Sequence, residues 1–146
     1  MASVVSINIS TKKGTIKKAN DEGYFIENFG LENDAHGGNW HRQVSLLAKE
    51  SIDKMRHRGI ELSPGIFAEN ITTEGIELHT LPVGTKIRIG ETVQEITQIG
   101  KTCHAACEIR MIIGDCIMPR EGIFTKVLKS GKIEKGNSIE ILNNEA

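Results

Sequence analysis

The sequence predicts a mainly β fold with some α, in which short strands form a closed or nearly closed β-barrel beside one substantial helix at about residues 46–58. Isoleucine is abundant, with 21 among 146 residues, and the 15 glycines divide the apolar segments from one another. Isoleucine and valine favour strands, and glycine marks the turns between them. Several short strands separated by glycine turns are typical of a barrel.

Alternating or short apolar segments give the expected strands. They are residues 2–9, 24–29, 85–89, 92–99, 123–129 and 137–142, the last two on either side of Ser130-Gly131. Residues 85–89 and 92–99 are expected to form a hairpin around Gly90-Glu91. In the second of these strands Val93, Ile96 and Ile99 are three residues apart, which predicts a bulge or a bend. The polar residues 11–22 are expected to form a loop or a weak hairpin.

One segment has the periodicity of a helix. Ala48, Ile52 and Met55 recur at the spacing i, i+4, i+7, which places their side chains on one face. Gly59 follows as a natural stop.

Length and charge limit the classes of function. A chain of 146 residues corresponds to a single domain, residues 1–146. Eighteen basic and nineteen acidic residues give a net charge of −1, which argues against binding nucleic acid through bulk charge. No apolar run approaches the roughly 18 residues of a membrane span, and no basic segment of a signal peptide begins the chain. We therefore expect a cytoplasmic protein without nucleic-acid or membrane partners.

Three cysteines, Cys103, Cys107 and Cys116, lie within 14 residues with the spacing C-x3-C-x8-C. An odd number of cysteines without an export signal argues against a disulfide framework. The spacing does not fit the paired C-x2-C of common zinc sites. A metal ligand, a sulfur-handling thiol and a small buried core residue all stay open for each cysteine.

A glycine-rich polar loop between residues 30 and 43 carries His36, His41 and Arg42. Polar loops held by a rigid scaffold often carry chemistry. Asp34 and His36 could equally hydrogen-bond the loop to itself. A metal site made of Asp34, His36 and His41 matches no standard spacing.

Several segments together resemble a stand-alone MOSC domain, named for the C-terminal domain of molybdenum cofactor sulfurase. They are residues 30–47, 64–71, 81–85 and 97–104, followed by Cys-Ile-Met-Pro-Arg-Glu-Gly-Ile-Phe from Cys116. The last run is similar to a bacterial subgroup found beside molybdopterin biosynthesis proteins. The resemblance covers nearly the whole chain.

The resemblance implies a barrel-like fold and a part in molybdenum cofactor metabolism. It implies a sulfur carrier or cofactor-handling protein whose cysteine accepts sulfane sulfur from a pyridoxal-phosphate desulfurase or ligates the metal. Some relatives reduce N-hydroxylated compounds with a bound molybdenum cofactor, and a non-catalytic cofactor-binding module is a third alternative. The expected partners are a cysteine desulfurase and cofactor biosynthesis proteins or molybdoenzymes, and no pyridoxal phosphate site is identified in this chain.

By position in the family pattern, Cys103 is the first candidate for the functional thiol and metal ligand, and Cys107 is the second. Lys101 and His104 flank Cys103, and nearby cations favour a thiolate. An anionic, phosphate-bearing pterin requires donors and positive charge. We therefore expect a loop facing the cysteine segment to contribute to its binding. The candidate cofactor-binding residues are His36, His41, Arg42, Asn70, Lys101 and His104. For Asn70 a structural role is the preferred alternative.

Overall fold

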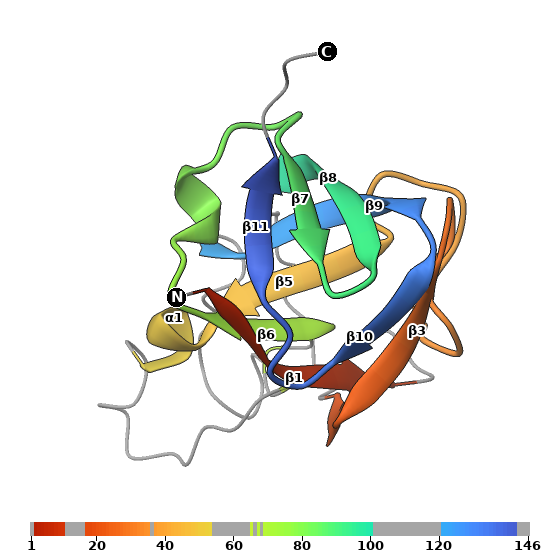
Figure 1. Ribbon diagram of the computed structural model, residues 1–146, viewed down its shortest axis with the longest axis horizontal. Helices are drawn as coiled ribbons and strands as arrows, with labels where there is room; N and C mark the ends of the chain where they lie inside the picture. The colour runs from red at the N-terminus through yellow and green to blue at the C-terminus, as the bar shows by residue number, and fades with distance from the viewer. Residues whose placement is uncertain are drawn as a thin grey trace, which may run out of the picture.

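In the computed structural model of the chain (Figure 1) the strands curve around a common core. The structure describes residues 2–10, 17–35, 37–53, 65, 67, 69–100 and 121–142. The elements in chain order are β1 (Ser3–Ile9), β2 (Lys18–Asn20), β3 (Glu22–Ile26), β4 (Gly30–Leu31), β5 (Val44–Ala48), α1 (Lys49–Asp53), β6 (Ile71–Glu74), the 3-10 helix η2 (Leu78–Thr80), β7 (Lys86–Ile89), β8 (Thr92–Ile99), β9 (Ile123–Lys129), β10 (Gly131–Glu134) and β11 (Ile139–Leu142). None of the helices in this part of the chain has the length or apolar character to cross a bilayer.

The strands form two sheets. The larger has the order β11-β7-β8-β9-β5-β6-β1-β2, and the smaller has the order β10-β3-β4. Neighbouring strands are antiparallel except β5 and β6, which run parallel. The fold is therefore mainly β, as the sequence predicts.

The closed barrel stays a prediction, because the larger sheet is not joined into a ring by a continuous ladder. Its two sides meet at one isolated bridge between Ser3 and Ser138. Two backbone hydrogen bonds flank this bridge, from Val4 N–H to the Asn137 carbonyl and from Ile139 N–H to the Ala2 carbonyl. β11 is four residues long, so little backbone is available to extend the pairing.

The helix expected at residues 46–58 is wrong at its beginning. Residues 46–48 belong to β5, which lies between β6 and β9 and is buried along its whole length. Leu46 and Leu47 point to opposite faces of the sheet and both are fully buried. A strand covered on both faces lacks the apolar–polar alternation by which a strand is recognised. Helix α1 occupies Lys49–Asp53, and residues 54–58 lie outside the described residues.

Other expected strands are confirmed, with differences at their ends. β8 coincides with residues 92–99, and its register with β9 shifts between Ile96 and Gln98, which is the predicted irregularity. β3 ends at Ile26 rather than at residue 29, because Asn28 has a left-handed φ of 61° that turns the chain. The C-terminal strand begins at Ile139 and pairs with β7, while β10 pairs with β3.

One apolar core fills the space between the sheets. It includes Phe25, Leu31, Leu46, Ile71, Ile87, Ile96 and Ile133, each at most 2% exposed. In β7 the burial alternates, so that Ile87 and Ile89 face this core while Lys86 and Arg88 are exposed. The core holds the ends of β5, β6, β8 and β9 together, and the candidate site lies at these ends.

Candidate functional site

The segment that carries the cysteines leaves and rejoins the fold at one place. β8 ends at Ile99 and β9 begins at Ile123, and the Gly100 N–H donates to the Gly122 carbonyl oxygen at 2.6 Å. Cys103, Cys107 and Cys116, together with Lys101 and His104, lie in residues 101–120, outside the described residues. The described chain therefore fixes the two ends of the cysteine segment side by side at the end of the β8–β9 pair.

His41 from the glycine-rich loop lies beside the first of these ends. Its Nε2 atom is 2.9 Å from the Gln98 side-chain oxygen, and the Gln98 amide nitrogen donates to the Gly100 carbonyl oxygen at 2.7 Å. The Thr97 hydroxyl also donates to the His41 carbonyl oxygen. The loop is thus tied to the residue after which the cysteine segment begins. His36, the other histidine predicted in this loop, lies outside the described residues.

Gly37 packs closely against Phe29. A Cβ atom on Gly37 would lie 2.4 Å from the Phe29 ring, so the exposed Phe29 side chain would have to move to accommodate it. The Gly38 N–H donates to the Phe29 carbonyl oxygen at 2.8 Å, which holds the loop against the end of β3.

Arg42 is half-buried between two aromatic rings. Its guanidinium carbon is 4.7 Å from the centroid of the Trp40 ring and 5.6 Å from that of Phe124 on β9. Such stacking stabilises a cation. The buried Arg42 Nε has no hydrogen-bond partner among the described residues. The side chain therefore brings positive charge and an unused donor to the part of the fold where an anionic ligand is expected.

Asn70 is completely buried, and its side chain is used within the protein. Its Oδ1 accepts hydrogen bonds from the backbone N–H and the hydroxyl of Ser45, at 3.0 and 3.2 Å. Its Nδ2 donates to the Asn8 carbonyl oxygen at 3.3 Å. These contacts join β5 to β1 and agree with the structural alternative for Asn70, so its role in cofactor binding stays a prediction without geometric support.

A buried ion pair anchors the glycine-rich loop. Lys17 Nζ lies 2.8 Å from Asp34 Oδ1, and both side chains are fully buried. The same Asp34 oxygen accepts the Ser10 N–H at 3.0 Å. Asp34 therefore bonds the loop to the segment after β1, rather than only to itself. Lys17 lies in a polar, lysine-rich stretch, and no pattern there distinguishes it from Lys18, which is exposed.

Glu69 is a buried ionisable residue next to Asn70. Its carboxylate accepts hydrogen bonds from the Gly65 N–H at 2.9 Å, the Phe67 N–H at 3.2 Å and the Thr72 hydroxyl at 2.7 Å. Burial raises the pKa of Glu69, because loss of hydration outweighs the opposing effect of these neutral donors. The carboxylate fixes Gly65 and Phe67 against β6.

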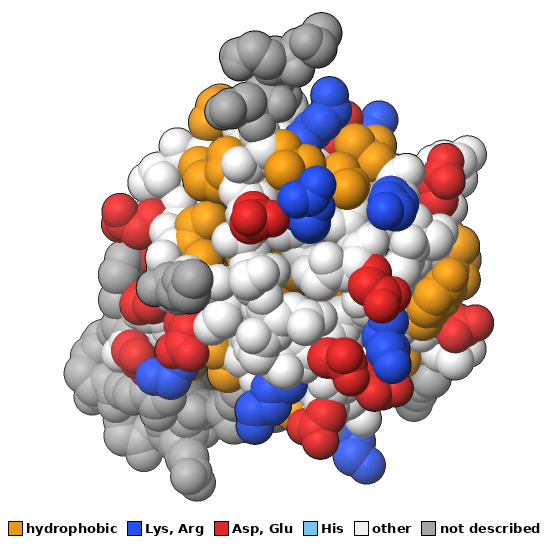
Figure 2. Space-filling view, viewed as in Figure 1, with side chains coloured by type: hydrophobic (Ala, Val, Ile, Leu, Met, Phe, Trp, Pro, Cys, Tyr) orange, Lys and Arg blue, Asp and Glu red, His pale blue; other side chains and the backbone are white. Residues whose placement is uncertain are grey.

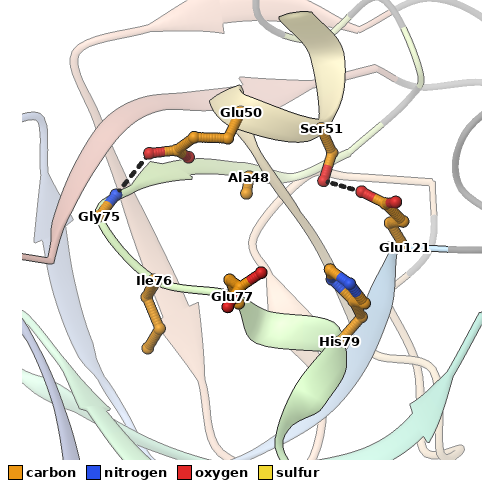
Figure 3. Close-up of a pocket in the computed structure, with 8 residues that line it drawn as sticks. All are labelled: Ala48, Glu50, Ser51, Gly75, Ile76, Glu77, His79 and Glu121. Atoms are coloured by element: carbon orange, nitrogen blue, oxygen red, sulfur yellow. Dashed lines mark hydrogen bonds between the residues drawn. The ribbon is translucent and has the colours of Figure 1, made fainter. Parts of the chain in front are cut away.

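A pocket of about 340 Å³ opens at the same end of the sheet. Figure 3 shows its lining, which is Ala48, Glu50, Ser51, Gly75, Ile76, Glu77, His79 and Glu121. The Ser51 hydroxyl donates to Glu121 Oε1 at 2.6 Å, and the Gly75 N–H donates to Glu50 Oε2 at 2.9 Å. Sequence reasoning missed this pocket, because its residues come from three separate segments of the chain.

Within the described part of the chain, no three His, Cys, Asp or Glu side chains are grouped closely enough to hold a metal ion. The predicted metal ligand Cys103 lies outside that part, so its role stays a prediction.

Comparison with known proteins identifies the family. The family model for the MOSC domain matches residues 32–140. The chain belongs to the MOSC family. The match includes most of the glycine-rich loop, both ends of the cysteine segment and the pocket residues. Proteins of the MOSC family are associated with the molybdenum cofactor, which agrees with the coarse expectation from the sequence.

Solved structures share the fold of this MOSC domain. The YuaD protein from Bacillus subtilis is 19% identical, with a TM-score of 0.73 over 97% of this chain and 96% of that one. YiiM from Geobacillus stearothermophilus is 19% identical, with a TM-score of 0.74 over 98% of this chain and 76% of that one. YiiM from Escherichia coli is also 19% identical, with a TM-score of 0.70 over 100% of this chain and 72% of that one. A comparison with curated proteins finds no match.

Proposed function

We propose that this MOSC protein carries sulfur or handles the cofactor in molybdenum cofactor metabolism, through a cysteine thiolate in the segment between Gly100 and Glu121. The observation that carries the proposal is the hydrogen-bonded chain His41–Gln98–Gly100. The His41 imidazole is linked through the Gln98 side chain to Gly100, which precedes Cys103 by three positions in the sequence.

The proposed sulfur-accepting step is a displacement at sulfur. The cysteine thiolate attacks the outer sulfur of a persulfide on a partner cysteine desulfurase. A new S–S bond forms on this chain while the S–S bond of the desulfurase breaks. The bonding electrons stay with the desulfurase cysteine, which leaves as a thiolate, so no external oxidant or reductant is needed.

The described residues fit an anionic cofactor in charge and in donors. Arg42 would hold an anionic group, because its charge is fixed by stacking on Trp40 and Phe124 and its Nε is unused. His41 is exposed at the same face and would add a second contact. When bound, the cofactor would supply a soft, sulfur-rich metal centre suited to a thiolate. The role of this chain's own residues is to bind the anion and to fix the base of the cysteine segment.

The test is persulfide formation on purified protein incubated with a cysteine desulfurase and cysteine, followed by mass spectrometry of the intact chain. Single Ser variants at Cys103, Cys107 and Cys116 identify the acceptor. We expect Cys103→Ser to lose the added sulfur. Loss in Cys107→Ser alone would move the site without removing the function, and no added sulfur on any thiol would overturn the sulfur-carrier proposal.

A second pair of variants tests the loop. His41→Ala is expected to slow persulfide formation severalfold, because His41 and Gln98 hold the base of the segment. Arg88→Ala is the control, because Arg88 is exposed on β7 and pairs only with Glu140 on β11 in the described chain. Equal rates for both variants would show that the loop takes no part in this reaction.

A further inference from the structure

We infer that the His41 imidazole accepts a proton from a thiol at the base of the cysteine segment, and that Gln98 is the positioning residue that fixes its tautomer. The inference rests on the proposed function, because it names the group that would turn the thiol into the thiolate which that function requires. In this transfer the S–H bond breaks and an N–H bond forms at His41 Nδ1. The electron pair stays on sulfur, so no further reactant is needed.

The Gln98 side-chain amide has one allowed orientation. Its Nε2 atom lies 2.7 Å from the Gly100 carbonyl oxygen, and a carbonyl oxygen can only accept a hydrogen bond, so the NH₂ group faces Gly100. Turning the amide round would bring two oxygens to this distance. The Gln98 side-chain oxygen therefore faces His41 Nε2, at 2.9 Å.

This orientation decides which nitrogen of His41 carries the hydrogen. The Gln98 oxygen can only accept, so His41 Nε2 is the donor. In the neutral imidazole the other nitrogen, Nδ1, then keeps its lone pair. Nδ1 has no hydrogen-bond partner among the described residues, and the side chain is exposed. Neutral His41 thus offers a proton acceptor whose direction is fixed by Gln98.

The acceptor is attached to the segment that carries the thiols. The Gln98 side chain joins the His41 ring to Gly100, and the Gly100 N–H donates to the Gly122 carbonyl oxygen. All three cysteines of the chain lie between these two glycines in the sequence. Imidazole is the side chain that most often transfers protons near neutral pH. Among the described residues, His41 is the imidazole linked to this base.

Arg42 supplies positive charge next to this acceptor. The Trp40 ring contacts both side chains, with its centroid 6.0 Å from that of the His41 ring and 4.7 Å from the Arg42 guanidinium carbon. A nearby cation stabilises a thiolate. After the proton transfer, the new Nδ1–H of His41 is a charged donor, which agrees with the second contact to an anion proposed above.

The experiment measures how fast iodoacetamide alkylates each cysteine of the full chain as a function of pH, by peptide mass spectrometry. His41→Gln is the decisive variant, because its amide nitrogen can replace Nε2 as the donor to Gln98 while no basic nitrogen remains. We expect His41→Gln and His41→Ala to alkylate the reactive cysteine about threefold more slowly at neutral pH, with the midpoint of the profile about one pH unit higher. A normal profile in His41→Gln would show that His41 is only a structural anchor and overturn the inference.

The tautomer is measured separately by long-range ¹H–¹⁵N spectra of the imidazole rings. We expect wild-type His41 to carry its hydrogen on Nε2, and Gln98→Leu to give a mixture of both tautomers. A hydrogen on Nδ1 in the wild-type protein, or the same tautomer ratio in Gln98→Leu, would overturn the positioning role.

His79→Gln is the matched control, because His79 is the other histidine in the described part of the chain and lines the pocket near Glu121. It should alkylate like the wild-type protein, and an effect as large as that of His41→Gln would contradict the assignment. Alkylation needs no desulfurase, so the two proposals can fail separately. A profile that depends on His41 without any persulfide would refute only the sulfur-carrier function, whereas persulfide formation with an unchanged profile in His41→Gln would refute only this inference.

Discussion

Lys17 and Asp34 form an ion pair of 2.8 Å with neither side chain exposed to solvent. Lys17 precedes β2, and Asp34 lies in the glycine-rich loop that leads to His41. Lys17 also donates to the Ser10 hydroxyl at 3.2 Å, so the ammonium connects the loop to the segment after β1. The loop that carries the predicted cofactor contacts is therefore anchored by a charge in the interior.

We expect Lys17→Met to lower the free energy of unfolding by about 3–5 kcal/mol, because it removes the ammonium group that compensates the buried charge of Asp34. Urea denaturation provides the measurement. Arg88→Met breaks the exposed Arg88–Glu140 pair and should cost less than about 1 kcal/mol. Equal losses in the two variants would contradict a buried charge at Asp34.

Gly65 and Gly84 have similar φ angles but differ in the space around them, so comparing their Ala variants tests the close packing at Gly65. Gly65 has a φ of +91°, and a Cβ there would lie 2.3 Å from the Lys17 carbonyl oxygen. Gly84 has a φ of +97°, with no atom within 4 Å of such a Cβ. Gly84→Ala should cost about 1–2 kcal/mol from backbone strain alone. Gly65→Ala should cost clearly more, because a backbone carbonyl must also move, and similar values would contradict the packing at Gly65.

The raised pKa of Glu69 predicts a specific dependence of stability on pH. A carboxyl whose pKa is higher in the folded state than in the unfolded state takes up its proton first in the folded state as the pH falls. The free energy of unfolding of the wild-type protein relative to Glu69→Gln should therefore increase from neutral pH into the acid range. Taking the difference removes the titration of the other carboxyl groups. A difference that is constant or decreases would contradict the prediction.

Arg42→Lys should destabilise the loop although it keeps the charge. A lysine cannot place a planar group between Trp40 and Phe124, and such contacts contribute about 1–2 kcal/mol. Trp40 is the only tryptophan of the chain, so its fluorescence reports on this loop during urea denaturation. Arg88→Lys, at an exposed position of β7, should leave the transition nearly unchanged, and a comparable shift would indicate that the stacking contributes little.

The local sequence pattern was sufficient to predict strands that have one buried and one exposed face. β7 follows the expected alternation, because one of its faces meets the core and the other meets solvent. β8 pairs with it in the expected hairpin, although its buried face carries the polar Thr92 and Gln94. β5 was assigned partly to a helix, because it is buried on both faces and its sequence carries no period of two. β6 and β10 were not expected at all. Each is a four-residue strand, and only one residue, Ser130, separates the end of β9 from the start of β10 at Gly131.

The candidate site, like the fold, could be predicted from the sequence only in part. The sequence alone indicated a functional loop with His41 and Arg42 and a cysteine segment after Gly100, because histidines, cysteines and clustered glycines can be recognised without knowing the fold. The burial of Lys17 and Glu69, the His41–Gln98 contact across 57 positions and the pocket between three chain segments were decided only by tertiary structure. Figure 2 shows Lys, Arg, Asp and Glu spread over the face in view, and composition cannot tell these from the few that the fold takes inside. Whether a charged side chain meets water, a counter-ion or a ligand depends on which distant segments pack against it, and no local period encodes that choice.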